Sequence, residues 1–446
     1  VAVIDSGVYD HPDLKGIADS NTNVIYQQDF VGDGNGAKDF YGHGTHVAGI
    51  VAGTGARSTG SYYFDTFRGV APDANIIDLR VLDSQGRGSD GSVISAIQRA
   101  VELKDTYNIR VINLSLGRGF FESYNQDPLC QAVRAAWEAG IVVVVAAGNF
   151  GRSNTLSTYG YGTITSPGNS PYVITVGAMN SRGTESRSDD VLATYSSKGP
   201  TAIDHVVKPD LVAPGNRIIS ALAPNATLAS NSSTRIPYAR YKYFGSLNNS
   251  SDYYQLSGTS MATPVVSGAA ALLLEKEPNL TPDQVKARLM KTAYKNFPAY
   301  SLIYDSSTGQ YFTVYYDIFS VGAGYLDIEA ALASADTATA PALSPTAVYD
   351  AQTGRVYLVS DQSVVWGSSV VWGTSVVWGT SVVWGSSVVW GESVIWGNSV
   401  VWGTNSLEGF SVIWGTSVVW GSSVVWGTSD SDMALEGLST MVEGEE

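Results

Sequence analysis

The run from Ile141 to Ala147 is the feature of this sequence that most limits its fold. Every residue from Ile141 to Val145 is apolar, so this segment cannot turn one face to water and must be buried on both faces. Strands of this kind occur almost only in parallel sheets that helices cover on both sides. Shorter apolar runs occur at Val1–Ile4, Ile76–Leu79, Val111–Leu114, Tyr172–Val176 and Leu211–Val212.

Segments with helical spacing separate these runs, at Ser92–Lys104, Gln131–Ala139 and Thr281–Lys291. The last opens with Thr281-Pro-Asp-Gln284, which offers a cap residue, a proline at the first helical position and a glutamine at the third. Alternating strands and helices predict an α/β fold, a doubly wound and mostly parallel sheet with helices on both faces. In such a sheet the ligand site lies at the carboxyl ends of the strands.

Composition limits the partners of the chain. Forty-one acidic against 26 basic residues give a net charge of −15, and an acidic surface repels the phosphate backbone of nucleic acids. No stretch of 18 or more apolar residues is present, so we expect no membrane-spanning helix. The single cysteine, Cys130, excludes an intrachain disulfide, and no signal peptide is visible.

The domain organisation follows from changes in composition. Residues 1–335 carry the alternation of strands and helices and are expected to form one domain, with surface insertions at Asn225–Tyr254 and Tyr294–Tyr316. Residues 336–362 are predicted to be a linker, and residues 429–446 an acidic tail.

Between them, residues 363–428 are eleven units of six residues, of the form Ser-Val-Val-Trp-Gly-Thr/Ser, and ten of the units carry the tryptophan. An even period would place every tryptophan on one face of an extended chain. A β-solenoid of stacked short strands and a low-complexity tail both remain open. We expect this region to associate with itself or with a surface.

Three segments carry residues suited to nucleophilic catalysis. Asp5 ends the first apolar run, and His43 stands between glycines in Gly42-His-Gly-Thr-His46. A histidine is the usual general base near neutral pH, and the sequence has only four. Ser260 lies in Gly258-Thr-Ser-Met-Ala-Thr-Pro264, at the amino end of an apolar helix, where backbone N–H groups favour developing negative charge. His46 could form a metal-binding fragment with His43, but packing of His46 within the helix is the preferred interpretation.

The order Asp, His, Ser and these three motifs together closely resemble the subtilisin-like serine peptidases, over residues 1 to about 335. The resemblance implies a catalytic triad of Asp5, His43 and Ser260, with Asn149 and the Ser260 N–H forming the oxyanion hole. It also implies that Ser115, Leu116 and Gly117, with Ala146, Ala147 and Gly148, bind the substrate peptide. The family normally has a further segment before the first catalytic strand and an inhibitory pro-domain in the precursor, and neither is in this sequence.

The resemblance implies catalysis without a cofactor, and leaves structural calcium as an alternative. Asp13 lies in a stretch whose aspartate can bind calcium in members of the family, although the companion loop matches poorly. Asp29, Asp33 and Asp39 lie in a glycine-rich loop that could supply oxygen ligands to a hard cation. Solvated loop carboxylates are the preferred interpretation of these three.

The predicted function is therefore that of a secreted serine endopeptidase, made as a zymogen, that cleaves proteins through an acyl-enzyme with a broad or apolar side-chain preference. A catalytically silent protein that binds a surface through its tryptophan repeats is the alternative, and the intact triad argues against it. A sedolisin-type peptidase, which uses a glutamate base, is excluded by the His-Gly-Thr-His segment.

Overall fold

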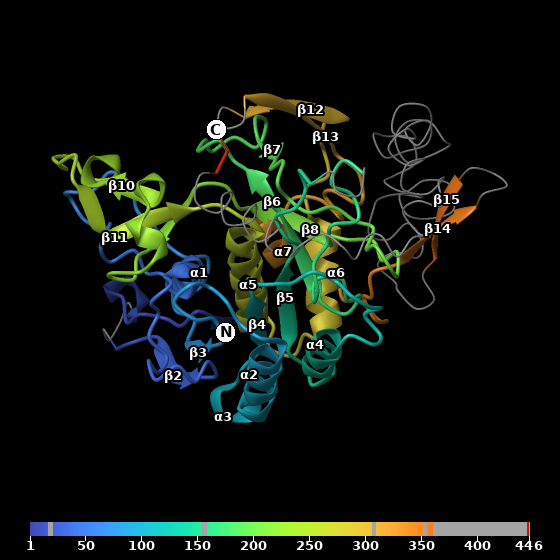
Figure 1. The fold of residues 1–446 in the computed structure, drawn as a ribbon, viewed down its shortest axis with the longest axis horizontal. Coiled ribbons are helices and arrows are strands. Elements are labelled where there is room, and N and C mark those ends of the chain that lie inside the picture. Colours follow the sequence, from blue (N-terminus) through green and yellow to red (C-terminus); the bar gives the residue numbers. More distant parts are fainter. Residues whose placement is uncertain (17–20, 154–157, 306–308, 351–354, 360–443, 446) are drawn as a thin grey trace.

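The computed structural model describes residues 1–16, 21–153, 158–305, 309–350, 355–359 and 444–445. At its centre is an eight-stranded sheet with the strand order β2-β3-β1-β4-β5-β6-β7, in which β8 also pairs with β6 (Figure 1). The strand pairs are parallel except for β6 with β7. The strands are β1 (Ala2–Asp5), β2 (Val24–Asp29), β3 (Ile76–Arg80), β4 (Val111–Leu114), β5 (Val142–Ala146), β6 (Ile174–Asn180), β7 (Val191–Leu192) and β8 (Leu211–Pro214).

Helices cover the sheet on both faces, as the sequence predicts. Every residue of β1, β3, β4, β5 and β6 is buried, which requires cover on each side. Helix α1 packs against α5, and α2 packs against α4, while α5 also lies against β4, β5, β6 and β8 (Figure 1). The helices are α1 (His43–Ala52), α2 (Asp90–Glu102), α3 (Lys104–Tyr107), α4 (Pro128–Glu138), α5 (Thr259–Lys276), α6 (Pro282–Thr292) and α7 (Ile328–Ala333). The capping box predicted at Thr281 is present at the start of α6.

The two predicted insertions form small sheets of their own. The first contains β10 (Arg235–Pro237) and most of β11 (Asn249–Leu256), and β11 pairs with β9 (Ile218–Ala221). Tyr253 and Tyr254 of this insertion are buried, so its inner side belongs to the packed body. The second insertion is the antiparallel hairpin of β12 (Tyr300–Asp305) and β13 (Gln310–Tyr315).

The described part of residues 336–362, the segment predicted to be a linker, contacts the body. The Ser344 hydroxyl donates to Asp210 Oδ1, a buried carboxylate that also pairs with two buried lysines, Lys208 and Lys286. The backbone N–H of Val207 donates to Pro345, and an antiparallel hairpin follows, β14 (Thr346–Asp350) with β15 (Arg355–Val359). Through these contacts the described part of the segment packs on the body.

The predicted repeats at 363–428 lie outside the described residues, as does the acidic tail except for residues 444–445. Within the residues that the structure describes, no helix combines the length and apolar character needed to cross a bilayer.

Candidate active site

Three neighbouring parallel strands deliver the predicted functional residues to one edge of the sheet. Strand β1 pairs with β4, and β4 with β5, so their carboxyl ends lie together. Asp5 is the last residue of β1, Ser115 directly follows β4, and Asn149 follows β5 by three residues. This is the edge at which a doubly wound sheet binds its ligands.

Asp5 and His43 form a buried hydrogen-bonded pair. Asp5 Oδ1 lies 2.7 Å from His43 Nδ1, and the same oxygen accepts the Ser6 N–H at 2.7 Å. His43 begins α1, and the next residue, Gly44, allows the helix to approach the strand end. A Cβ atom on Gly44 would lie 2.2 Å from the carbonyl oxygen of Gly7, which is too close for any side chain. Only glycine therefore fits at the position that follows the histidine.

The surroundings of His43 raise the pKa of its imidazole. Burial is the largest single influence and favours the neutral ring, but the charge of Asp5, its hydrogen bond and the charge of Asp39 together outweigh burial. The Asp5 contact also makes Nδ1 the protonated nitrogen of the neutral ring, so Nε2 keeps a lone pair that can accept a proton. Nε2 has no hydrogen-bond partner among the described residues.

His46 does not join this site. Its ring is fully buried and its Nε2 lies 2.9 Å from the carbonyl oxygen of Ile218. Burial, with a smaller contribution from His43, lowers the pKa of His46 to about 3, so the ring is neutral. The position agrees with the preferred interpretation of His46 as a packed helix residue.

Asp39, a weak candidate for a metal ligand, instead holds the start of α1 in place. Its carboxylate accepts the N–H groups of Gly42 and Thr45 at 2.7 and 2.9 Å, and the Ser6 hydroxyl at 2.8 Å. Burial raises the pKa of Asp39 to about 6. Both oxygens of Asp39 accept hydrogen bonds from protein donors. These bonds fix the start of α1 and so position His43. This role of Asp39 was not predicted from the sequence.

Ser260 is the second residue of α5, and its surroundings follow from the proline four residues later. Pro264 has no N–H, so the Ser260 carbonyl lacks its normal helical donor. The Ser115 hydroxyl replaces that donor at 2.8 Å. The Ser260 hydroxyl donates to the carbonyl of Ser115 at 3.2 Å. The serine is thus tied to the end of β4, and its hydroxyl is not bonded to His43 in this structure.

Asn149 is oriented by a residue that the sequence analysis did not single out. Asn149 Oδ1 accepts the Thr259 backbone N–H at 2.9 Å and the Thr259 hydroxyl at 3.1 Å. A backbone N–H can donate only to the oxygen of the amide, so the opposite end of the side chain is the NH₂ group. Gly258 leaves room for that group, since a Cβ there would lie 3.2 Å from Asn149 Nδ2. In the sequence, the only indication of this role was that Thr259 directly precedes the serine.

These residues line one cleft of about 450 Å³. His43, Asn149 and Ser260 line it together with five of the six predicted substrate-binding residues, namely Ser115, Leu116, Gly117, Ala146 and Gly148. The sixth, Ala147, is fully buried and does not line the cleft.

Arg118 is a further cleft residue that the sequence analysis did not identify. Its guanidinium bonds to Asp90 at 2.8 Å and to the buried Asp127 at 2.9 Å. It thereby joins the start of α2 to the start of α4 along one wall. Both carboxylates neutralise the guanidinium, so this wall presents little net charge to a substrate.

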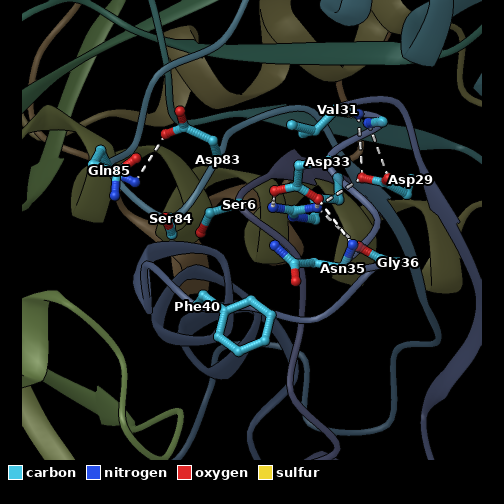
Figure 2. A network of polar contacts seen from close by, with 12 residues as sticks. Ser6, Asp29, Val31, Asp33, Asn35, Gly36, Phe40, Asp83, Ser84 and Gln85 are labelled. Carbon is cyan, nitrogen blue, oxygen red and sulfur yellow. Dashed lines mark hydrogen bonds and ion pairs between the residues drawn. The ribbon is translucent and has the colours of Figure 1, made fainter.

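The other candidate metal ligands are also bound by protein groups. Asp29 and Asp33, both labelled in Figure 2, each form an ion pair with the Arg80 guanidinium, with N···O distances of 3.0 and 2.7 Å. The hydrogen bond from Arg80 lowers the pKa of Asp33. The guanidinium thus supplies the positive charge that a calcium ion would have brought, and the residues present do not fit a calcium site.

Asp13 is likewise engaged. It accepts the Arg57 N–H at 2.8 Å and the Tyr253 hydroxyl at 2.5 Å. Burial is the main reason that the pKa of Asp13 is raised. Within the described ranges, no group of three or more histidine, cysteine and acidic side chains is arranged to hold a metal ion.

Comparisons with known proteins point to one family. A family model described as the Subtilase family matches residues 1–316. The serine protease AprX of Bacillus subtilis is 41% identical over 295 residues, which cover 65% of this chain and 60% of AprX. Subtilisin DY of Bacillus licheniformis is 34% identical over 294 residues, covering 66% of this chain and 82% of the relative. The chain therefore spans about three fifths of AprX and four fifths of subtilisin DY. The solved structure of sphericase is similar with a TM-score of 0.52 and 28% identity, over 74% of this chain and 91% of that one.

Proposed function

The chain belongs to the subtilase family, and from this premise we propose that it is a serine endopeptidase. The observation that carries the proposal is the common cleft of His43, Ser260 and Asn149, with Asp5 hydrogen-bonded behind the histidine. Each has the chemistry that acyl transfer from a peptide requires, namely a nucleophile, a base, a group that orients the base, and an amide donor for the oxyanion.

In this mechanism Ser260 Oγ attacks the scissile carbonyl of the substrate. The hydroxyl leaves its bond to the Ser115 carbonyl and passes its proton to His43 Nε2, the ring nitrogen without a partner among the described residues. Asp5 holds the ring and stabilises the imidazolium that forms. His43 then protonates the leaving amine, and water releases the acyl-enzyme.

The oxyanion is proposed to lie between Asn149 Nδ2 and the backbone N–H of Ser260. The first residues of a helix have N–H groups without intrahelical acceptors, and Ser260 is the second residue of α5. Because Thr259 fixes the amide before substrate arrives, little reorganisation is required when negative charge develops.

The lining of the cleft supports the proposed apolar or broad side-chain preference. Its walls include Leu82, Val93, Leu116 and Leu129, and the charge of Arg118 is compensated by two carboxylates. Ser115, Leu116 and Gly117 continue from the end of β4. A substrate peptide could add there as an extra strand.

The test of the proposal compares the wild-type protein with Ser260→Ala. We expect the wild type to cleave casein and to react with a fluorophosphonate probe, and the variant to do neither while keeping its far-ultraviolet circular dichroism. A folded wild-type protein that fails to react with the probe would support the alternative, a silent protein that acts through its tail. Cleavage by Ser260→Ala at the wild-type rate would show that Ser260 is not the nucleophile.

The remaining features of the protein are proposals that rest on the family. We propose secretion, an inhibitory pro-domain in the precursor, catalysis without a cofactor, and a catalytic domain of residues 1–335 on which residues 336–359 pack. The repeats at 363–428 are proposed to mediate self-association or attachment to a surface. Sedimentation of the full chain, compared with one ending at Val359, tests the self-association.

A further inference from the structure

The end of the chain returns to the body and inserts a carboxylate into it. Glu445 is 2% exposed, although it is the last residue but one of the sequence. Its carboxylate oxygen Oε1 lies 2.8 Å from Arg152 Nη2 and accepts the backbone N–H of Thr194 at 2.9 Å. It also accepts the hydroxyl of Thr194. A buried carboxylate is stable only with such charged and hydrogen-bonding partners.

The backbone of Glu445 is held separately, by one side chain. Asn216 Nδ2 donates to the Glu445 carbonyl at 2.7 Å, and the Glu445 N–H donates to Asn216 Oδ1 at 2.8 Å. The Asn216 amide thus bonds both the N–H and the carbonyl of one residue, which is how a neighbouring β-strand pairs with a peptide backbone. Asn216 is itself buried, and its side-chain amide bonds to Glu445 through both its nitrogen and its oxygen.

The pocket also selects the residue before Glu445. Gly444 has φ of +66°, a backbone conformation that favours glycine. A Cβ atom on Gly444 would lie 2.4 Å from Ser257 Oγ and 3.0 Å from Arg217 Cγ. The site therefore fits a glycine followed by a glutamate, and Gly444 and Glu445 provide that pair.

We propose that Arg152, Thr194 and Asn216 form a receptor for the chain's own terminal Gly444–Glu445. Bound there, the end of the chain is latched to the body in the same molecule. Gly444 and Glu445 are thereby fixed to the body, on which the described residues up to Val359 also lie. In Figure 1 the carboxyl terminus lies by β7 and the β12–β13 hairpin. This proposal does not depend on the proposed catalytic activity.

Arg152 makes the latch removable without loss of the fold. Its guanidinium also pairs with Asp305 at 2.7 Å and stacks on the ring of Phe312, both in the β12–β13 hairpin. When Glu445 leaves, Arg152 keeps a buried counter-charge. Variants at the end of the chain are therefore expected to fold.

Trimming by an added carboxypeptidase tests the latch. In an inactive Ser260→Ala background, we expect the carboxypeptidase to stop after removing at most one residue from the end of the chain. Asn216→Ala and Glu445→Ala should be trimmed past residue 444 at least about tenfold faster, because cleavage follows the population of the open form. Glu329→Ala, an acidic position exposed on α7, is the control and should behave as the parent. Trimming of the parent as fast as Asn216→Ala would refute the latch.

Discussion

Replacing Thr259 by valine separates the orientation of the oxyanion donor from its presence. Valine has the shape of threonine but no hydroxyl, so it removes the 3.1 Å bond to Asn149 Oδ1 and retains the 2.9 Å bond from the backbone N–H. The hydroxyl also accepts the Gly148 N–H at 3.2 Å, which loses that acceptor. Asn149 remains in place with one of its two anchors.

The expected loss follows from the number of bonds removed. One neutral hydrogen bond contributes about 0.5–1.5 kcal/mol, so kcat should fall about 2- to 13-fold. Asn149→Leu removes the donor itself, and kcat should then fall about 10²–10³-fold, the loss known for the corresponding amide in subtilisin. KM should change little in both variants, because the donor bonds the substrate fully only in the transition state.

Steady-state kinetics on a chromogenic peptide would measure both losses, with Thr259→Ser, which keeps the hydroxyl, as the matched control. The double variant Thr259→Val/Asn149→Leu should be no slower than Asn149→Leu alone, since Thr259 acts through the amide. A Thr259→Val loss as large as that of Asn149→Leu, or additive losses in the double variant, would refute the argument that Thr259 orients the amide.

Three further predictions concern the base, the cation sites and the tail. The raised pKa of His43 means that the ring becomes the neutral base only above the ordinary value of about 6.5, so the acidic limb of kcat/KM should lie above that pH. Asp5→Asn should shift this limb to lower pH and reduce kcat about 10⁴-fold; an unmoved limb would contradict the pairing. Dialysis against EDTA should leave the melting temperature unchanged because Arg80 supplies the positive charge of its loop, and a fall that added calcium reverses would disprove this. A chain ending at Val359 should keep most of its activity on a small peptide, and a folded but inactive product would assign the tail to the enzyme proper.

The sequence predicted the parallel sheet because the strand at Ile141–Val145 is apolar on every residue, a pattern that solvent-exposed strands do not show. Boundaries were predicted within a few residues: the expected helix at Ser92–Lys104 begins at Asp90, where Ser89 accepts the Ser92 N–H as a cap. The strand at Val24–Asp29 was missed, since only its first residue is buried and its pattern is that of an edge.

The sequence predicted a residue's role where a short motif around that residue defines the role. It did not predict a role that depends on partners far away in the sequence. His43 and Ser260 stand in short motifs with their own glycines, whereas Asp29 and Asp33 differ from calcium ligands only through Arg80, 47 residues beyond Asp33. Carboxylates in a glycine-rich loop attract either kind of cation. The sequence does not show which cation the fold brings to them.

Helix α5 links the position of Ser260 to the stability of the whole fold. Thirteen of its 18 residues are buried, and it packs against four strands of the sheet as well as α1. The serine therefore cannot detach by local fraying, as a residue on a surface loop can, because its movement requires the central core to open. Heat inactivation should accordingly follow the cooperative melting of the core, with no earlier phase in which a folded protein has lost its nucleophile. For a protein of this build, enzymatic activity is itself a measure of how much of the population is folded.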